Sequence, residues 1–313
     1  MGDNTYINEA ELKATVHKLA NVSTTQRMCH MRFGSEPLPS QDMIKQIVAV
    51  CRELLFPGFF GCDNVNSYNL EYVIGLQCER LKAMLESQVA AGLCFDRPCD
   101  KTDLGDIFAR AEAITRRFIN SLPELRSVLH DDVEAIYNGD PAATSYEEVI
   151  YCYPSVKAIT NYRLAHEFMA AGVPIIPRMM TELAHNETGI DIHPGASIGR
   201  HFAIDHGTGV VIGATTIIGD NVKLYQGVTL GARSFALDES GNPVKGVPRH
   251  PIIGNNVIIY SNATILGRIH VGDNAVVGGN IWVTTDVAPG EHRVQAKPSN
   301  VAAQKNRGAS LFS

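Results

Sequence analysis

The stretch IGATTIIGDNVKLYQGVTL, from Ile212 to Leu230, places an aliphatic residue at every sixth position. A six-residue period fits neither the 3.6-residue turn of an α-helix nor the two-residue alternation of a strand, but it is typical of the short strands of a parallel β-helix. Small and polar residues such as Gly219 and Asn221 tolerate the backbone angles that the corners of such a coil require. The same spacing continues on both sides and includes thirteen positions: Ile192, Ile198, Ile204, Ile212, Ile218, Leu224, Leu230, Ile253, Ile259, Ile265, Val271, Val277 and Val283.

The first part of the chain has a helical pattern instead. Ser40 is a predicted N-cap, and Gly172 followed by Pro174 predicts a helix stop. Apolar residues recur at three- and four-residue spacings in four segments: Ser40 to Leu55, Tyr68 to Ala91, Leu104 to Leu122 and Ser155 to Ala171.

The length of 313 residues is large for one core, so we expect more than one domain. The sequence predicts an α+β protein, with an all-helical N-terminal domain over 1–185, a β-helix over 186–301 and a tail over 302–313. A β-helix has open ends that need caps or neighbouring subunits. We therefore expect the helical domain to cap one end and to support an oligomer.

Composition and charge narrow the class of protein. The net charge of -6 without any run of like charge predicts neither nucleic acid nor a membrane surface as partner. No apolar stretch reaches the roughly 18 residues of a membrane span, and residues 1–15 lack the pattern of a signal peptide. The 7 cysteines form no C-x-x-C pair, which indicates reduced thiols and no structural metal. We expect a cytoplasmic protein.

The six-residue period first breaks after Ile204, because the next inward residue, Ile212, comes eight positions later. Two extra residues push side chains out of the regular stack, and His206 is displaced there. Histidine titrates near neutral pH, so His206 beside Asp205 is a candidate general base. A polar corner pair without a function is an equally good interpretation of the spacing alone.

The second break is a long loop between Leu230 and Ile253. A loop of this length on a regular scaffold is usually functional or disordered, and its composition does not decide which. It ends in Arg249 and His250. His250 is a second candidate base, and the fixed fork of the Arg249 guanidinium suits a carboxylate.

Several ordered blocks of this sequence resemble the serine O-acetyltransferases. They are DIHPGASIGR (191–200), IDHGTGVVIG (204–213), VTLG (228–231) and RHP (249–251), with DPA (140–142) and YRLAH (162–166) upstream. The resemblance implies a left-handed β-helix and a homotrimer, often paired into a dimer of trimers through the helical domain, with active sites between subunits. The implied reaction transfers the acetyl group of acetyl-CoA to the hydroxyl of L-serine, giving O-acetylserine for cysteine synthesis.

By position, the resemblance makes His206 the general base and Asp191 the carboxylate that orients its imidazole. A serine hydroxyl needs a base within hydrogen-bond reach, while a thioester supplies a good leaving group without a metal. A carboxylate on the far ring nitrogen would fix the tautomer and stabilise the imidazolium. The contact between Asp191 and His206 rests on the resemblance, because 15 residues separate them.

The same resemblance assigns the substrate contacts. Asp140 and Asp205 would hold the serine ammonium, while Arg249 and His250 would meet its carboxylate or the developing oxyanion. Acetyl-CoA would lie in a groove between coils of adjacent subunits. The expected cofactor contacts are backbone groups and cations: Gly231, Ala232, Arg233, Lys245, Ala263, Gly278 and Lys297.

This sequence also departs from the pattern of the family. The loop 232–248 is longer than in the common form, and Pro248 stands where an aspartate usually precedes the Arg-His pair. Residues 295–300 differ from the usual stretch near the cofactor. The chain ends in Leu311-Phe312-Ser313 instead of the isoleucine with which many relatives dock into cysteine synthase, so we do not assume that complex.

Other functions remain open at this point. Altered cations leave room for another acceptor, such as homoserine, O-phosphoserine or a sugar. His201 and His206 are also similar to the histidine pair of γ-class carbonic anhydrases, with His193 as a third candidate zinc ligand. A β-helix without catalytic function is the remaining alternative.

Overall fold

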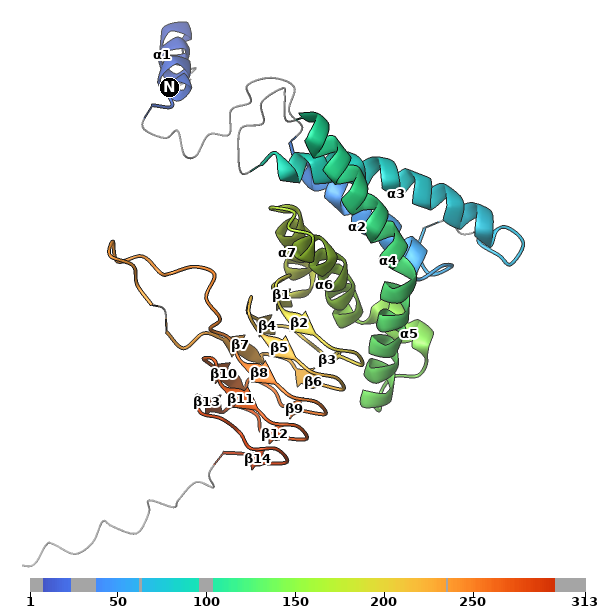
Figure 1. Cartoon of the computed structure of the whole chain (residues 1–313), viewed down its shortest axis with the longest axis vertical. Helices are drawn as coiled ribbons and strands as arrows, with labels where there is room; N and C mark the ends of the chain where they lie inside the picture. The colour runs from blue at the N-terminus through green and yellow to red at the C-terminus, as the bar shows by residue number, and fades with distance from the viewer. Residues whose placement is uncertain (1–7, 24–37, 62–63, 96–103, 235, 296–313) are drawn as a thin grey trace, which may run out of the picture.

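The computed structural model describes residues 8–23, 38–61, 64–95, 104–234 and 236–295. Its helices precede its strands (Figure 1). The helices are α1 (Glu9–Ala20), α2 (Gln41–Leu55), α3 (Leu70–Leu93), α4 (Leu104–Gly139), α5 (Tyr146–Cys152), α6 (Pro154–Ala170) and α7 (Ile176–Thr188). The strands are β1 (Asp191–Ile192), β2 (Ser197–Ile198), β3 (Ala203–Asp205), β4 (Val211–Ile212), β5 (Ile217–Ile218), β6 (Lys223–Tyr225), β7 (Thr229–Gly231), β8 (Ile252–Ile253), β9 (Ile258–Ile259), β10 (Thr264–Leu266), β11 (His270–Val271), β12 (Val276–Val277), β13 (Trp282–Val283) and β14 (His292–Arg293).

The helix signals read from the sequence are largely confirmed. The Ser40 side chain caps α2 by accepting a hydrogen bond from the N–H of Met43. Helix α6 ends at Ala170, and Gly172 adopts a left-handed φ of 69° as the chain turns away. No described helix meets the length and apolarity that crossing a membrane requires.

Helix α4 is longer than the segment Leu104 to Leu122 in which the spacing indicates a helix, because it continues through Pro123 to Gly139. A proline inside a helix removes one backbone donor and crowds the preceding turn. The following turns offset this cost by burying four apolar side chains on one face: Leu125, Leu129, Val133 and Ile136.

The strands form a left-handed parallel β-helix, which confirms the predicted fold class. The first face of the prism holds β1-β4-β7-β10-β13, the second holds β2-β5-β8-β11 and the third holds β3-β6-β9-β12-β14. Each strand pairs with its equivalent one turn away, as Ile192 pairs with Ile212 and Leu230 with Ile265. All inward aliphatic positions except the partly buried Ile198 are at most 3% exposed, so they form the core of the prism.

A buried ion pair attaches the helical part to the first turns of the β-helix. Arg163 on α6 donates two hydrogen bonds to the Asp132 carboxylate on α4, at 2.6 Å and 2.9 Å. The same guanidinium donates to the carbonyls of Ile198 and Gly199, and Asp132 accepts the N–H of Phe202 at 2.9 Å. The pair therefore fixes the helices to the corner between the second and third faces.

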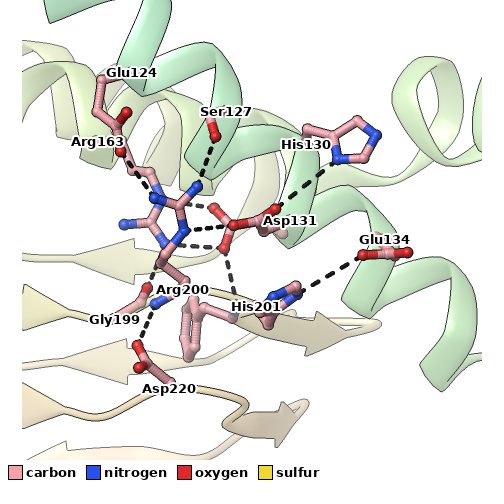
Figure 2. Close-up of polar contacts among 12 residues, drawn as sticks. Glu124, Ser127, His130, Asp131, Glu134, Arg163, Gly199, Arg200, His201 and Asp220 are labelled. Atoms are coloured by element: carbon pink, nitrogen blue, oxygen red, sulfur yellow. Dashed lines mark hydrogen bonds and ion pairs between the residues drawn. The ribbon is translucent and has the colours of Figure 1, made fainter.

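A second arginine extends this attachment toward solvent (Figure 2). The Arg200 guanidinium donates to Asp131 at 2.5 Å, to Glu124 at 2.8 Å and to Ser127 at 2.7 Å, all on α4. The backbone N–H of Arg200 donates to the Asp220 carboxylate in the next turn of the coil. Arg163 and Arg200 thus bind the same stretch of α4 from its buried and its exposed side.

Candidate active site

His206 lies at the corner between the third and first faces, where the six-residue period first breaks. Its φ of 57° is in the left-handed region, which costs a non-glycine residue roughly 1–2 kcal/mol. The next residue, Gly207, lacks a side chain because a Cβ there would collide with Ile190. The imidazole is 74% exposed, so the two extra residues place it outside the stack of inward side chains.

Asp205 connects His206 to a lysine. Its Oδ1 lies 3.7 Å from Nε2 of His206, and its Oδ2 lies 3.1 Å from Nζ of Lys223 on β6. The carboxylate is only 14% exposed. Burial lowers the pKa of Lys223, but its contacts with Tyr225 and Asp205 outweigh that effect and raise the pKa overall, so the ammonium stays charged.

Asp140 directly follows α4 and faces the same corner. Its carboxylate accepts a hydrogen bond from the Tyr153 hydroxyl at 2.5 Å and from the N–H of Ala142 at 2.8 Å. These two bonds, with weaker attraction from Lys223 and His206, hold the pKa of Asp140 below its usual value. The same carboxylate raises the pKa of Tyr153 to about 12, which keeps the phenol a donor.

A small pocket between the end of α4 and the third face of the prism is lined by Asp140, Tyr153, Asp205 and Lys223, but not by His206. Its remaining walls are Ile136, Ala203 and Ile204. We call Asp140, Tyr153, Asp205, His206 and Lys223 the acidic half-site. It combines an accessible imidazole with two ionised carboxylates, which suits a base next to a bound cation.

Arg249 and His250 lie at a different corner, where the long loop returns to β8. The Thr215 hydroxyl accepts hydrogen bonds from the N–H groups of Arg249 and His250, at 2.9 Å and 3.2 Å. The Arg268 guanidinium donates to the carbonyl oxygens of Thr215 and His250. We call Thr215, Arg249, His250 and Arg268 the basic half-site.

His250 is held as a neutral hydrogen-bond donor. Burial, followed by the charge of Arg249, lowers the pKa of His250 to about 4. Its Nδ1 accepts the backbone N–H of Thr215 at 3.1 Å, so the proton belongs on Nε2. Gly213 leaves room for this ring, since a Cβ at Gly213 would collide with it.

The two half-sites lie on opposite edges of the first face. His206 follows β3 and precedes β4, whereas Arg249 and His250 lie between β7 and β8. The sheet that contains β1, β4 and β7 runs between these two corners. The carboxylates of Asp140 and Asp205 and the side chains of Arg249 and His250 are predicted to bind the same substrate. Within a single chain, however, they lie at two different corners.

Asp191 contacts another arginine instead of the predicted base. Its Oδ1 lies 3.7 Å from Nη1 of Arg178, which also pairs with Glu182 on α7. Among the described residues, no hydrogen bond or ion pair joins Asp191 to His206. The ligand atoms of Glu182, His185 and Asp191 lie within 4.8 Å of one another, but both carboxylates of this group are already ion-paired with the Arg178 guanidinium.

The predicted cofactor contacts lie at the two edges of the first face. Gly231, Ala232, Arg233 and Lys245 belong to the corner of the basic half-site, whereas Ala263 and Gly278 follow β9 and β12 on the opposite edge. The N–H groups of Ala263 and Gly278 are already bonded within the coil, to Tyr260 and Arg293. Lys297 and the tail 302–313 lie outside the described residues.

The three candidate zinc histidines lie at three different corners. His193 follows β1, His201 follows β2 and His206 follows β3. His201 occupies a regular corner position with a φ of 54°. Asn221, at the equivalent corner one turn later, has a similar φ of 56°. These three histidines therefore form no common group within the described part of one chain.

Sequence reasoning missed Tyr153, Thr215 and Lys223. Tyr153 and Thr215 look like an ordinary helix boundary and an ordinary coil corner, and their roles depend on partners far along the chain. The sequence does contain one signal for Lys223. The equivalent positions in the adjacent turns, Ala203 and Ile258, are apolar, so a lysine between them is an exception to the pattern.

Known proteins with similar sequences and structures are serine acetyltransferases, although no family model matches the chain. The chain is 42% identical over 290 residues to the protein named serine acetyltransferase, plasmid, of Synechococcus elongatus, covering 91% of each. Serine acetyltransferase 1 of Entamoeba histolytica, solved with L-cysteine, has a TM-score of 0.68 and 32% identity over 91% of this chain and 97% of that one. The serine acetyltransferase of Neisseria gonorrhoeae, solved with serine, has a TM-score of 0.51 and 25% identity. The match covers 80% of this chain and 95% of that one.

Proposed function

Because this chain belongs to the serine acetyltransferases and is therefore an acyltransferase, we propose that it transfers the acetyl group of acetyl-CoA to the hydroxyl of L-serine. The products are O-acetylserine and CoA. One observation carries the proposal: His206 projects from the coil, 74% exposed, with Nε2 3.7 Å from a carboxylate oxygen of Asp205. The ammonium of serine can bind Asp140 and Asp205 while its hydroxyl faces the imidazole.

His206 then acts as the general base. It takes the hydroxyl proton as the serine oxygen attacks the thioester carbonyl, which forms the new C–O bond. The C–S bond breaks, and the departing thiolate receives the proton from the imidazolium. We propose Asp191 as the carboxylate that stabilises this imidazolium, which requires it to exchange Arg178 for His206.

The basic half-site would complete the pocket from a neighbouring subunit. Arg249 offers a two-pronged donor for the serine carboxylate, and neutral His250 offers its Nε2 proton to the same group or to the oxyanion. The separation of the half-sites on one prism supports a homotrimer or a dimer of trimers, in which one chain contributes carboxylates and the next contributes cations. The helical part, 1–185, would cap the prism and connect the subunits.

The proposed groove for acetyl-CoA runs along the first face, between prisms. Arg233 lies against Gly267 at the edge of that face, and Lys245 lies in the adjoining loop, so both cations are available for phosphates. Gly231 ends β7 and Ala232 begins this loop, while Ala263 and Gly278 border the opposite edge. Since their N–H groups are used within the coil, Ala263 and Gly278 would contribute close packing instead of donors.

The experiment that tests the function measures thiol release from acetyl-CoA with a panel of acceptors. We expect L-serine to be the best acceptor in a panel with homoserine, O-phosphoserine and amino sugars. The two carboxylates favour an ammonium and repel the phosphate of O-phosphoserine, while the cations of the basic half-site favour a carboxylate, which amino sugars lack. A chelator should leave the rate unchanged. A higher rate with another acceptor would contradict the proposed substrate. Inactivation by the chelator would contradict the metal-free mechanism.

The variant Arg249→Lys should raise the KM for serine about tenfold, because a fork that makes two hydrogen bonds becomes a point charge. The KM for acetyl-CoA should stay within about twofold. Arg116→Lys is the matched control, since Arg116 is exposed on α4 and belongs to neither half-site. An unchanged KM for serine in Arg249→Lys would remove Arg249 from the acceptor pocket.

A further inference from the structure

Lys223 links the two structural elements that carry the carboxylates of the acidic half-site. Its Nζ lies 3.1 Å from Oδ2 of Asp205 and donates to the carbonyl oxygen of Gly139 at 2.5 Å. Gly139 is the last residue of α4, and Asp140 follows it directly. One ammonium therefore binds both the strand end that carries Asp205 and the helix end that carries Asp140.

The surroundings of Lys223 are unusual for a residue selected only for packing. Its side chain is 18% exposed, and it lies in register between Ala203 and Ile258 on the third face. Its Nζ also lies 4.5 Å from the centre of the Tyr225 ring, a cation–π distance. A charged group is costly in such a place unless it is paired, and the paired carboxylate is Asp205.

Lys223 also sets the charge of the half-site. Asp140 and Asp205 carry two negative charges, and the ammonium cancels one of them. The remaining single negative charge matches the single ammonium of an amino acid. Without Lys223, the two carboxylates would repel each other and would lose the group that fixes the distance between them.

We propose that Lys223 is a positioning residue that holds Asp140 and Asp205 at a fixed separation and leaves the acceptor pocket with one net negative charge. This inference rests on the proposed function, in which those carboxylates bind the serine ammonium. Lys223 itself touches neither the reacting hydroxyl nor the thioester. It acts through Asp205, whose other oxygen faces His206.

The test compares Lys223→Met, Lys223→Gln and Lys223→Arg with the wild type. The first two should raise the KM for serine about tenfold and leave the KM for acetyl-CoA unchanged. Lys223→Arg keeps the positive charge, so its KM for serine should stay within about threefold of the wild-type value. Lys157→Met is the control, because Lys157 is a partly buried lysine that is ion-paired with Glu187, outside both half-sites.

A second readout distinguishes charge from general damage. The charged groups facing His206 are Asp205, Asp140 and Lys223, while Tyr153 is neutral. Removing the lysine cation takes a positive charge away from the surroundings of His206, so the acidic limb of kcat/KM should move up by about half a pH unit. NMR titration of the His206 ring measures the same shift without substrate.

The outcomes separate this proposal from the proposed function. Wild-type protein that does not acetylate serine would refute the function, while the NMR titration would still test whether Lys223 sets the charge at His206. Active wild type with an unchanged KM and an unchanged His206 titration in Lys223→Met and Lys223→Gln would overturn the role of Lys223. A raised KM that Lys223→Arg does not rescue would also overturn it.

Discussion

Replacing His206 by alanine should lower kcat by about 10²- to 10⁴-fold while the β-helix stays folded. The serine hydroxyl then has no base within reach, whereas the two carboxylates that bind the ammonium remain. The KM for serine should therefore change little compared with kcat. Steady-state kinetics at saturating acetyl-CoA, with circular dichroism to check the fold, measures this effect.

The backbone at His206 calls for a second variant. Alanine is poorly suited to the left-handed φ of 57°, whereas asparagine adopts this region readily and does so at Asn262 and Asn280 in later turns. His206→Asn should lose as much activity as His206→Ala with less strain in the corner. If His206→Asn keeps more than about a tenth of the wild-type kcat, His206 is not the general base.

His201→Ala is the matched control for the base. His201 also has a left-handed φ, of 54°, but it lies at the corner between the second and third faces, next to Glu134 on α4 (Figure 2). Its removal should leave kcat within about twofold. Loss of activity in both histidine variants, together with inactivation by a chelator, would favour the zinc enzyme over the acetyltransferase mechanism.

The second large effect is expected on stability. Replacing Arg163 by methionine should destabilise the folded protein by about 3–5 kcal/mol, because Asp132 is left as a buried charge without its cation. Asp132 is 1% exposed and Arg163 is 7% exposed, so water does not take over the lost contacts. The free energy of unfolding from urea titrations, at one protein concentration, measures the loss.

Arg200→Met is the control for this prediction, because Arg200 binds the same part of α4 from its exposed side. Its side chain is 41% exposed, so its removal should destabilise the protein far less than the removal of Arg163. The double variant Arg163→Met with Asp132→Leu should recover much of the stability by removing the stranded charge. Equal losses for Arg163→Met and Arg200→Met would show that the buried pair is not the main attachment.

The coil of the β-helix was predictable because it depends on local spacing. Each inward residue, such as Leu224, pairs with its equivalent one turn away, so a period in the sequence becomes a period in space. The displacement of His206 followed from the same count. The end of α4 was not predictable, since Pro123 is a local signal that the burial of later residues overrides.

The sequence by itself determined the fold class, the two places where the coil breaks and the candidate site residues that those breaks carry. The tertiary structure decided which residues share a site, because Asp140, Tyr153, Asp205 and Lys223 come from different elements and only packing brings their charges within reach. It also decided that Asp191 pairs with Arg178, and that Arg249 lies across a sheet from His206. The physical reason is that a repeat encodes neighbours within the coil, whereas electrostatic contacts between the coil and the helices depend on distances that no local pattern records.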